Sequence, residues 1–323
     1  MSLAKVAEQI KKSKSFLITA HSNPEGDAIG SEMALRELLV YLGKKAVIVN
    51  EGSAPNEYRF LPGIEQIKRP KEVNNIAFDA FVALDCSDPG RFKKLANLFA
   101  KGKVKINIDH HISNSGFGDI NWVDPDSSSA SEMIYELYKR LRVPLDKNKA
   151  LYLYTGILTD TGSFHYLNTT SRTMQIAADL LRYDLNVNAV YRNIYENFPF
   201  SDIKLLTKII TTMKSDMQHR IIWFRIKRGL LKGSKVSFDL TEHILSFGRM
   251  IREAEVVVLF KENLKNRDQI RINLRSKRLD VNKIAKIFGG GGHRSASGAT
   301  VCGSLKSAER RVIDKIKQQL SRS

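Results

Sequence analysis

Apolar and polar positions alternate with two different periods along the first half of the chain. Short apolar runs, typical of buried strands, occur at residues 15–20, 45–50, 78–84 and 104–108. Segments with helical spacing lie between or after them, at residues 31–42, 131–141, 147–158 and 170–181. Apolar strands that alternate with helices are typical of a parallel sheet covered on both faces. We therefore predict an α/β fold with a doubly wound, mainly parallel N-terminal sheet.

The pattern changes after residue 185. Residues 186–216 have a helical, linker-like pattern, and a second block follows with strands expected at 220–225, 254–260 and 269–274 and a basic helix at 305–320. A chain of 323 residues is also long for one core. We predict an N-terminal domain at 1–185, a helical linker at 186–216 and a smaller C-terminal α/β domain at 217–323, with the active-site cleft between the two domains.

Composition narrows the class of protein. A hydrophobic fraction of 42% with 27% charged residues is ordinary for a folded chain, and no apolar run is long enough for a membrane span. The first residues are too polar for a signal peptide. Two cysteines provide no disulfide framework, so a cytoplasmic location is expected. The formal net charge of +18 favours anionic partners, although a basic surface alone identifies no substrate.

Side chains that can bind metals follow several of the predicted strands. His21, Glu25 and Asp27 come after the first strand, and Asp85 ends the third. Asp109, His110 and His111 end the fourth strand, and Asp160 lies in a predicted turn after a helix. In an open parallel sheet the carboxyl ends of the strands line one crevice, where ligands bind. We expect these groups to meet there.

Carboxylates gathered this closely repel one another unless a cation lies among them. Mixed imidazole and carboxylate ligands suit Mn²⁺, Zn²⁺ or Fe²⁺, and so many ligands favour two metal ions over one. Each residue alone has an ordinary structural alternative: Asp85 and Asp160 are common turn residues, and Asp27 could cap the following helix. The adjacent histidines have few structural uses, so the combination favours a metal site.

The second block carries a different kind of candidate site. Four glycines, residues 289–292, precede His293, and such a run can form a turn whose backbone N–H groups approach a ligand. A flexible linker is the alternative. Arg275 and Ser276 lie at the end of the strand expected at 269–276, where arginine could bind phosphate through its planar fork. An ordinary exposed strand would show the same alternation.

Together these motifs resemble a known family. HSNPEGDAIGS, ALDCSDPGR, NIDHHISN and GILTDTGSFHY are similar to the four motifs of the DHH phosphoesterases, in their usual order. INLRSK and IAKIFGGGGHRSASGA resemble the DHH-associated domain. The resemblance extends from about His21 to Thr300 and is strongest to the bacterial nano-RNase and pAp phosphatase branch.

The resemblance implies a site with two divalent metal ions, typically Mn²⁺, with Mg²⁺ or Co²⁺ as alternatives. His21, Glu25 and Asp85 would hold the first ion, and Asp27, Asp85, His110 and Asp160 the second, with Asp85 bridging. His111 would be catalytic beside Asp85 and would face the substrate phosphate. Glu25 stands where the family usually has Asp. The implied substrate-binding residues are Arg275, Ser276, Gly290, Gly291, Gly292 and His293.

The implied activity is hydrolysis of very short oligoribonucleotides (nano-RNA) or of 3′-phosphoadenosine 5′-phosphate (pAp). A phosphodiesterase for cyclic or linear dinucleotides is the enzymatic alternative, and a catalytically impaired nucleotide-binding protein, with Glu25 as the lesion, is the alternative from another class. The implied partners are short single-stranded RNA or small nucleotides and no membrane. A homodimer is an expectation from the resemblance alone.

Overall fold

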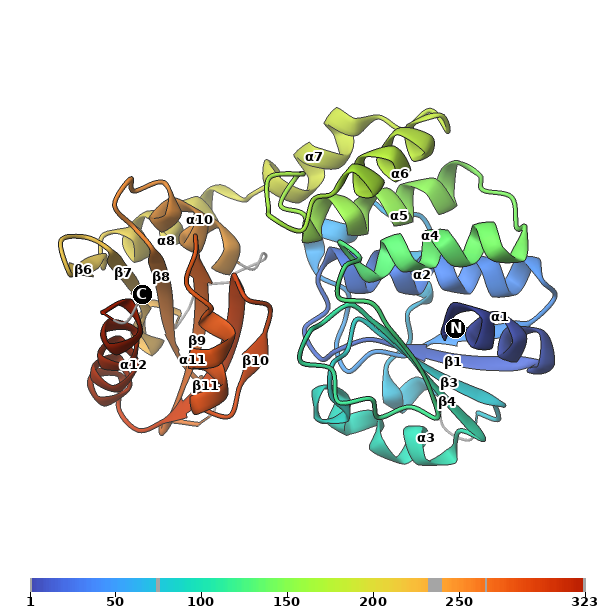
Figure 1. Ribbon diagram of the computed structural model, residues 1–323, viewed down its shortest axis with the longest axis horizontal. Coiled ribbons are helices and arrows are strands. Elements are labelled where there is room, and N and C mark those ends of the chain that lie inside the picture. Colours follow the sequence, from blue (N-terminus) through green and yellow to red (C-terminus); the bar gives the residue numbers. More distant parts are fainter. Residues whose placement is uncertain (1, 74–75, 232–239, 265, 322–323) are drawn as a thin grey trace. The chain divides into compact units, whose positions relative to one another are not determined.

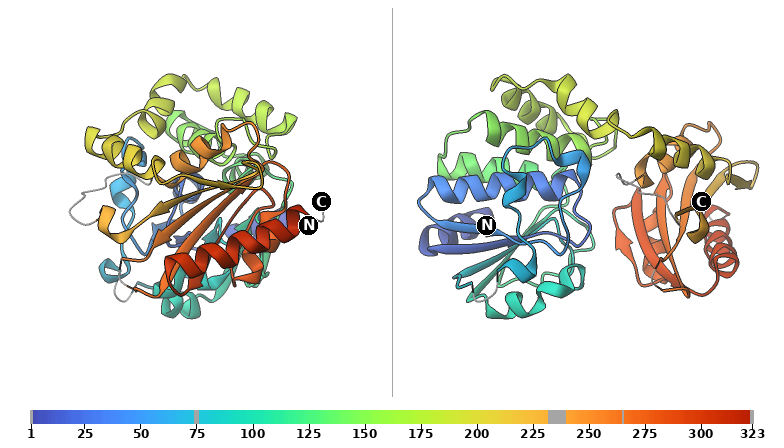
Figure 2. Two further views of the ribbon diagram at one scale, coloured as in Figure 1. Left: turned by 90° about the vertical axis from the view of Figure 1, so that its left-hand side faces the viewer. Right: turned by 180° about the vertical axis from the view of Figure 1, so that it is seen from behind.

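The chain is described here from a computed structural model, which covers residues 2–73, 76–231, 240–264 and 266–321. It divides into two units, Met1–Asn197 and Phe198–Ser323, which are described separately (Figures 1 and 2). Among the described residues, no helix is long and apolar enough to cross a membrane.

The first unit is built on a five-stranded parallel sheet with the strand order β2-β1-β3-β4-β5. Its strands are β1 (Ser15–Thr19), β2 (Lys45–Ile48), β3 (Ala80–Leu84), β4 (Val104–Asp109) and β5 (Ile120–Val123). Every residue of β3 is buried, as its continuous apolar run predicted. β2 and β3 lie on opposite sides of β1, so the strand order reverses there and the topological switch point lies between β1 and β3.

Helices cover both faces of this sheet, which confirms the doubly wound fold (Figure 1). They are α1 (Ser2–Lys12), α2 (Gly26–Tyr41), α3 (Ala96–Lys101), α4 (Ala130–Leu141), α5 (Lys147–Asp160), α6 (Ser171–Leu181) and α7 (Val187–Tyr195). Ile18 and Val82 face a core shared with α1, α2, α4 and α5. Leu17 and Phe81 face the opposite core, where Phe81 and Phe99 of α3 meet edge to face at 5.2 Å between ring centroids.

In the first unit the structure differs from the sequence-based expectation at β5, at the start of α2 and at Asp160. β5 was not predicted, because its four residues include Asn121 and do not form an apolar run. α2 begins at Gly26 and not at residue 31, so that Asp27 lies in its first turn. The predicted turn at Asp160 is wrong: the helical hydrogen bonds continue to Thr161, whose N–H donates to the Ile157 carbonyl at 3.1 Å, and Asp160 is the last residue of α5.

The second unit holds a six-stranded sheet with the order β10-β11-β9-β8-β7-β6. The strands are β6 (Lys214–Asp216), β7 (Ile221–Ile226), β8 (Val256–Glu262), β9 (Gln269–Ser276), β10 (Gly291–Gly292) and β11 (Ala296–Cys302). Of the strand pairs that the described residues form in this unit, β7–β8 is the parallel one and the others are antiparallel. This mixed sheet with helices confirms a second α/β domain.

The helices of the second unit are α8 (Phe200–Ile210), α9 (Arg228–Leu231), α10 (Thr241–Arg249), α11 (Val281–Ile287) and α12 (Leu305–Leu320). α11 and α12 pack on one face of the sheet, and α8 and α10 pack on the other; Figure 2 shows α12 in red across the strands. In the segment expected to be a linker, Val190 and Ile194 of α7 join the first core, whereas Leu205 and Ile209 of α8 join a core of the second unit. The domain boundaries at 185 and 216 stay predictions.

Candidate metal centre and active site

The loop between β1 and α2 begins the candidate site at the switch point of the first sheet. His21 follows the buried end of β1 and is itself buried. Glu25 is the N-cap residue of α2, has an extended backbone and makes no side-chain cap. Two glycines bring α2 close to α5: a Cβ on Gly26 would collide with the Thr159 side chain, and one on Gly30 would collide with the Tyr152 carbonyl oxygen. This close packing brings the first turn of α2 toward the last turn of α5.

Asp27 binds the N-terminus of a different helix from its own. Its Oδ2 accepts a hydrogen bond from the Ala130 N–H at 2.6 Å, and its Oδ1 accepts one from the Ser131 N–H at 2.8 Å. The carboxylate therefore lies at the positive end of α4. Burial, together with the negative charges of Asp85 and Asp160, nevertheless raises the pKa of Asp27 to about 7. A cation at this position would relieve that repulsion.

Asp85 lies at the centre of the site. It follows β3 in the left-handed region with φ +49°, and its N–H donates to the Ile108 carbonyl at 3.0 Å. Three imidazoles surround its carboxylate: the nearest ring nitrogens of His21, His110 and His111 are each 3.5 Å from it. Burial alone would raise the pKa of Asp85, but these histidines hold it well below its usual value.

His110 faces the carboxylates with one nitrogen and the backbone with the other. Its Nδ1 is 3.2 Å from the Ser127 carbonyl oxygen, which fixes Nδ1 as the donor and Nε2 as the atom that can ligate a metal. Nε2 lies 3.5 Å from Asp85, 3.6 Å from Asp160 and 3.9 Å from Asp27. Although burial opposes the charged form, these carboxylates raise the pKa of His110 well above its usual value.

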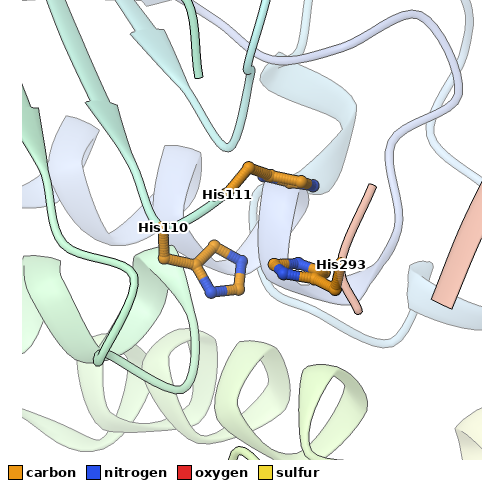
Figure 3. Close-up of side chains that lie close together, drawn as sticks. All are labelled: His110, His111 and His293. Carbon is orange, nitrogen blue, oxygen red and sulfur yellow. The ribbon is translucent and has the colours of Figure 1, made fainter. Parts of the chain in front are cut away.

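His111 projects from the same loop after β4, beside His110 (Figure 3). The Nδ1 of His111 donates to Oδ1 of the fully buried Asp109 at 2.7 Å. Asn114 donates to the other oxygen of Asp109 at 2.6 Å and so fixes that carboxylate. Burial opposes the charged form of His111, but Asp109 outweighs it and raises the pKa of His111. The sequence placed Asp109 among the side chains expected in the crevice, but its role as the hydrogen-bond partner of His111 was not predicted.

The structure brings most of the predicted metal ligands together. Asp27, Asp85 and His110 offer ligand atoms that lie within 4.8 Å of one another, and Asp85, Asp109 and His111 form a second such group. His21 and Asp160 adjoin the first group through Asp85 and His110. Glu25 is exposed at its helix cap and belongs to neither group in the described part of the chain.

The predicted substrate-binding residues of the second unit lie where β9, β10 and β11 meet. Arg275 is paired with Ala296 across the β9–β11 ladder, and the Ser276 N–H donates to the Ser295 carbonyl at 2.9 Å. The His293 N–H donates to the Ala296 carbonyl at 2.7 Å, which closes the hairpin between β10 and β11. The Arg275 guanidinium forms a two-pronged ion pair with Glu242 of α10.

Only part of the glycine run is a turn. Gly289 has φ +71°, a conformation that favours glycine, whereas Gly291 and Gly292 form the short strand β10. A Cβ on Gly290 would collide with the Gly298 carbonyl oxygen, so the neighbouring strand itself requires glycine there. Close backbone packing therefore accounts for Gly290.

An open parallel sheet with buried carboxylates and imidazoles at its switch point is an arrangement that can hold divalent metal ions. The N-terminal domain of the DHH family matches residues 15–157, and the DHHA1 domain matches residues 225–322. The chain is 32% identical over 322 residues to the bifunctional oligoribonuclease and PAP phosphatase NrnA of Thermus thermophilus, covering 98% of this chain and 94% of that one. The chain therefore belongs to the DHH family, whose members are metal-dependent hydrolases of phosphate esters.

Two further proteins are similar to this chain. The Bacillus subtilis protein with the same name is 29% identical, with 93% of each chain covered. Among solved structures, an exopolyphosphatase-related protein from Bacteroides fragilis superposes with a TM-score of 0.88 at 24% identity, over 99% of this chain and 97% of that one. This likeness supports the fold of the whole chain.

Proposed function

We propose that this protein hydrolyses phosphate ester bonds in very short oligoribonucleotides and in pAp, with two divalent metal ions held around Asp85. The observation that carries the proposal is the set of three imidazoles, each 3.5 Å from the Asp85 carboxylate, at the switch point of the sheet. The names of the Thermus and Bacillus relatives, bifunctional oligoribonuclease and PAP phosphatase, support the choice of substrates.

The donor atoms present fit divalent metal ions. Asp27, Asp85 and Asp160 all approach the Nε2 atom of His110, and their mutual repulsion is the kind that a bound cation removes. Within the described residues, Nδ1 of His21 is buried without a hydrogen-bond partner. Imidazole nitrogens mixed with carboxylate oxygens favour Mn²⁺ over Ca²⁺.

We assign the ligands to two ions that share Asp85. His21, Glu25 and Asp85 would hold one ion, and Asp27, Asp85, His110 and Asp160 would hold the other. Glu25 has the weakest support, because it lies exposed at the cap of α2. When bound, the ions would supply activation of water and neutralisation of phosphate charge.

The chain's own residues would orient the substrate and handle its proton. His111 would contact the phosphate and donate a proton to the leaving oxygen, because Asp109 holds Nδ1 and so fixes the ring. In the second unit, Arg275, Ser276, Gly290, Gly291, Gly292 and His293 would bind a phosphate group. Glu242 keeps the Arg275 guanidinium in one orientation, which reduces the entropy lost when a phosphate binds.

A substrate panel tests this proposal. Purified protein is incubated with pAp, the linear dinucleotide pApA, a pentanucleotide RNA and pyrophosphate, with Mn²⁺ or with EDTA. We expect turnover of pAp and RNA with Mn²⁺, none with EDTA and none of pyrophosphate. Exclusive turnover of pApA would establish the dinucleotide phosphodiesterase instead, and tight nucleotide binding without any turnover would establish an impaired nucleotide-binding protein.

We also propose which ion the protein binds, in which cellular compartment it acts and in which oligomeric state. Mn²⁺ is proposed as the ion, to be checked by metal analysis of protein purified without added metal. Both cysteines are free, Cys86 buried and Cys302 exposed, which suits the reducing cytosol. A homodimer is proposed, and sedimentation of the purified protein decides between dimer and monomer.

A further inference from the structure

The net positive charge of the chain lies almost entirely in the second unit. Residues 1–197 contain 25 Lys and Arg against 23 Asp and Glu, whereas residues 198–323 contain 27 against 11. The second unit thus carries a formal charge of +16, out of +18 for the whole chain. Binding the one or two phosphate groups of a small nucleotide needs few cationic side chains, whereas neutralising the several phosphates of a polynucleotide backbone needs many.

Among the described residues, the half of the second sheet formed by β9 and β11 has a hydrophobic helix core on only one of its two faces. Ile270, Ile272 and Leu274 of β9 pack against α11 and α12 on one side. On the other side, the core beneath α8 and α10 takes its strand residues from β7 and β8. The side chains that β9 and β11 place on that second side are polar or small, and Arg271 and Thr300 among them are exposed.

Strand register assembles these side chains into one patch. Arg271 lies directly opposite Lys261 of β8 and Thr300 of β11, and Asn273 lies opposite Gly298 one step further along. We call Lys261, Arg271, Asn273 and Thr300 the β9 face. Like charges directly opposite each other on neighbouring strands, as in Lys261 and Arg271, repel one another, and a bound anion reduces that repulsion.

The β9 face continues toward the predicted phosphate-binding end of the same strand. Arg275 is on the same side of β9 as Arg271, four residues further along. A rise of about 3.3 Å per residue separates the two backbone positions by about 13 Å. Successive phosphates of an RNA strand could contact both arginines, whereas pAp offers only one nucleoside between its two phosphates.

We propose that the β9 face binds the sugar-phosphate backbone of single-stranded RNA and favours oligoribonucleotides over mononucleotides as substrates. This inference rests on the proposed function for its substrate class. The cations would neutralise backbone phosphates, and Asn273 and Thr300 would add hydrogen bonds to phosphate or ribose oxygens. Binding at this face would not depend on base sequence.

The test uses the full chain carrying Lys261→Ala and Arg271→Ala together. Binding of a labelled pentanucleotide RNA is measured by fluorescence anisotropy in EDTA, at several salt concentrations, and pAp binding is measured by competition. We expect RNA affinity to fall about tenfold, with a salt dependence shallower by about 0.7 per lost phosphate contact, and pAp affinity to change less than about twofold.

The matched control is Lys306→Ala with Arg310→Ala, which removes the same charge from exposed positions of α12, on the opposite side of the sheet. It should leave RNA affinity near the wild-type value. Equal losses in the two double variants, or equal losses for RNA and pAp, would overturn the inference. Because binding is read without turnover, failure of the hydrolysis assay would not be mistaken for failure of this inference.

Discussion

At the scale of single residues, Asp109 acts through its neighbour. It is fully buried, one oxygen accepts from Asn114 at 2.6 Å, and the other accepts from His111 Nδ1 at 2.7 Å. Because the hydrogen bond from Asn114 holds this carboxylate in place, the carboxylate fixes both the tautomer and the ring orientation of the histidine that it binds. Asp109 is therefore a positioning residue for His111.

Replacing Asp109 by Asn keeps the shape and removes the charge. We expect kcat for pAp to fall about 10- to 100-fold while KM changes less than about threefold, because the phosphate contacts remain and the imidazole loses its partner. Steady-state kinetics provide the measurement. Asp184→Asn is the control, since the Asp184 side chain is exposed. An equal effect in both variants would contradict a positioning role.

Glu32 is a second buried carboxyl group, and its protonation makes the stability of the protein depend on pH. Its Oε2 accepts a hydrogen bond from Asn50 at 2.8 Å, and burial raises its pKa to about 8. The folded protein therefore keeps the proton of Glu32 at neutral pH, whereas the unfolded chain, with the ordinary value of 4.5, loses it. Stability from this group is greatest below pH 4.5 and declines as the pH rises toward 8.

A Glu32→Gln variant should lack this decline. Between pH 6 and pH 8 we expect the free energy of unfolding of the wild type to drop relative to the variant by about 2 kcal/mol. In this pH range the folded protein holds one proton that the unfolded chain has already lost, and each pH unit then lowers the stability. Urea unfolding of metal-free protein at both pH values measures the difference. Parallel pH profiles for the two proteins would show that Glu32 is not protonated in the fold.

At the scale of elements, the pairing of α2 with α5 brings the site together. Gly26 and Gly30 on α2, with Gly156 on α5, let the two helices approach more closely than side chains would allow. The first turn of α2 carries Asp27 and the last turn of α5 carries Asp160, so the distance between these carboxylates depends on that approach. Part of the HSNPEGDAIGS motif is thus explained by helix packing.

Gly30→Ala should disrupt this pairing. The new methyl group would collide with the Tyr152 carbonyl, which cannot rotate away, so we expect a loss of about 1–3 kcal/mol in stability and a weaker affinity for Mn²⁺. Denaturant unfolding and metal titration measure the two effects. The control is Gly52→Ala, where a Cβ meets nothing within 4 Å. Wild-type stability and metal affinity in Gly30→Ala would refute the packing argument.

Sequence reasoning predicted the elements whose pattern is continuous and missed those without one. β1, β3 and β4 are apolar runs, and their ends located Asp85 and the histidine pair. β5 and the two-residue β10 have no such run, because pairing with neighbours makes them strands. Short strands of this kind are specified by tertiary contacts, which local sequence does not contain.

Partners that are distant in the chain could not be predicted either. Asp27 receives hydrogen bonds from Ala130 and Ser131, more than one hundred residues away, and so does not cap its own helix. Glu242 meets Arg275 across 33 residues. Nothing in the local pattern specifies which helix terminus or which carboxylate completes such a pair, so the chemistry of the site was predictable but its supporting contacts were not.

At the scale of the whole molecule, the candidate catalytic residues and the net positive charge lie in different units. The first unit is nearly neutral, yet it buries Asp27, Asp85 and Asp109 beside histidines. The second unit carries almost all of the net positive charge and buries no comparable group of carboxylates and imidazoles among its described residues. This division fits an enzyme that cleaves with one unit and attracts a polyanion with the other.

The most direct test of the account is a titration of Mn²⁺ into wild-type protein and into Asp85→Asn, followed by pAp hydrolysis in the same samples. Asn suits the left-handed backbone at residue 85, so the fold should survive, as circular dichroism can verify. We expect the wild type to bind two ions per chain and to hydrolyse pAp, and the variant to lose at least one ion and about 1,000-fold in rate. Wild-type rate and metal stoichiometry in Asp85→Asn would contradict the central role of Asp85.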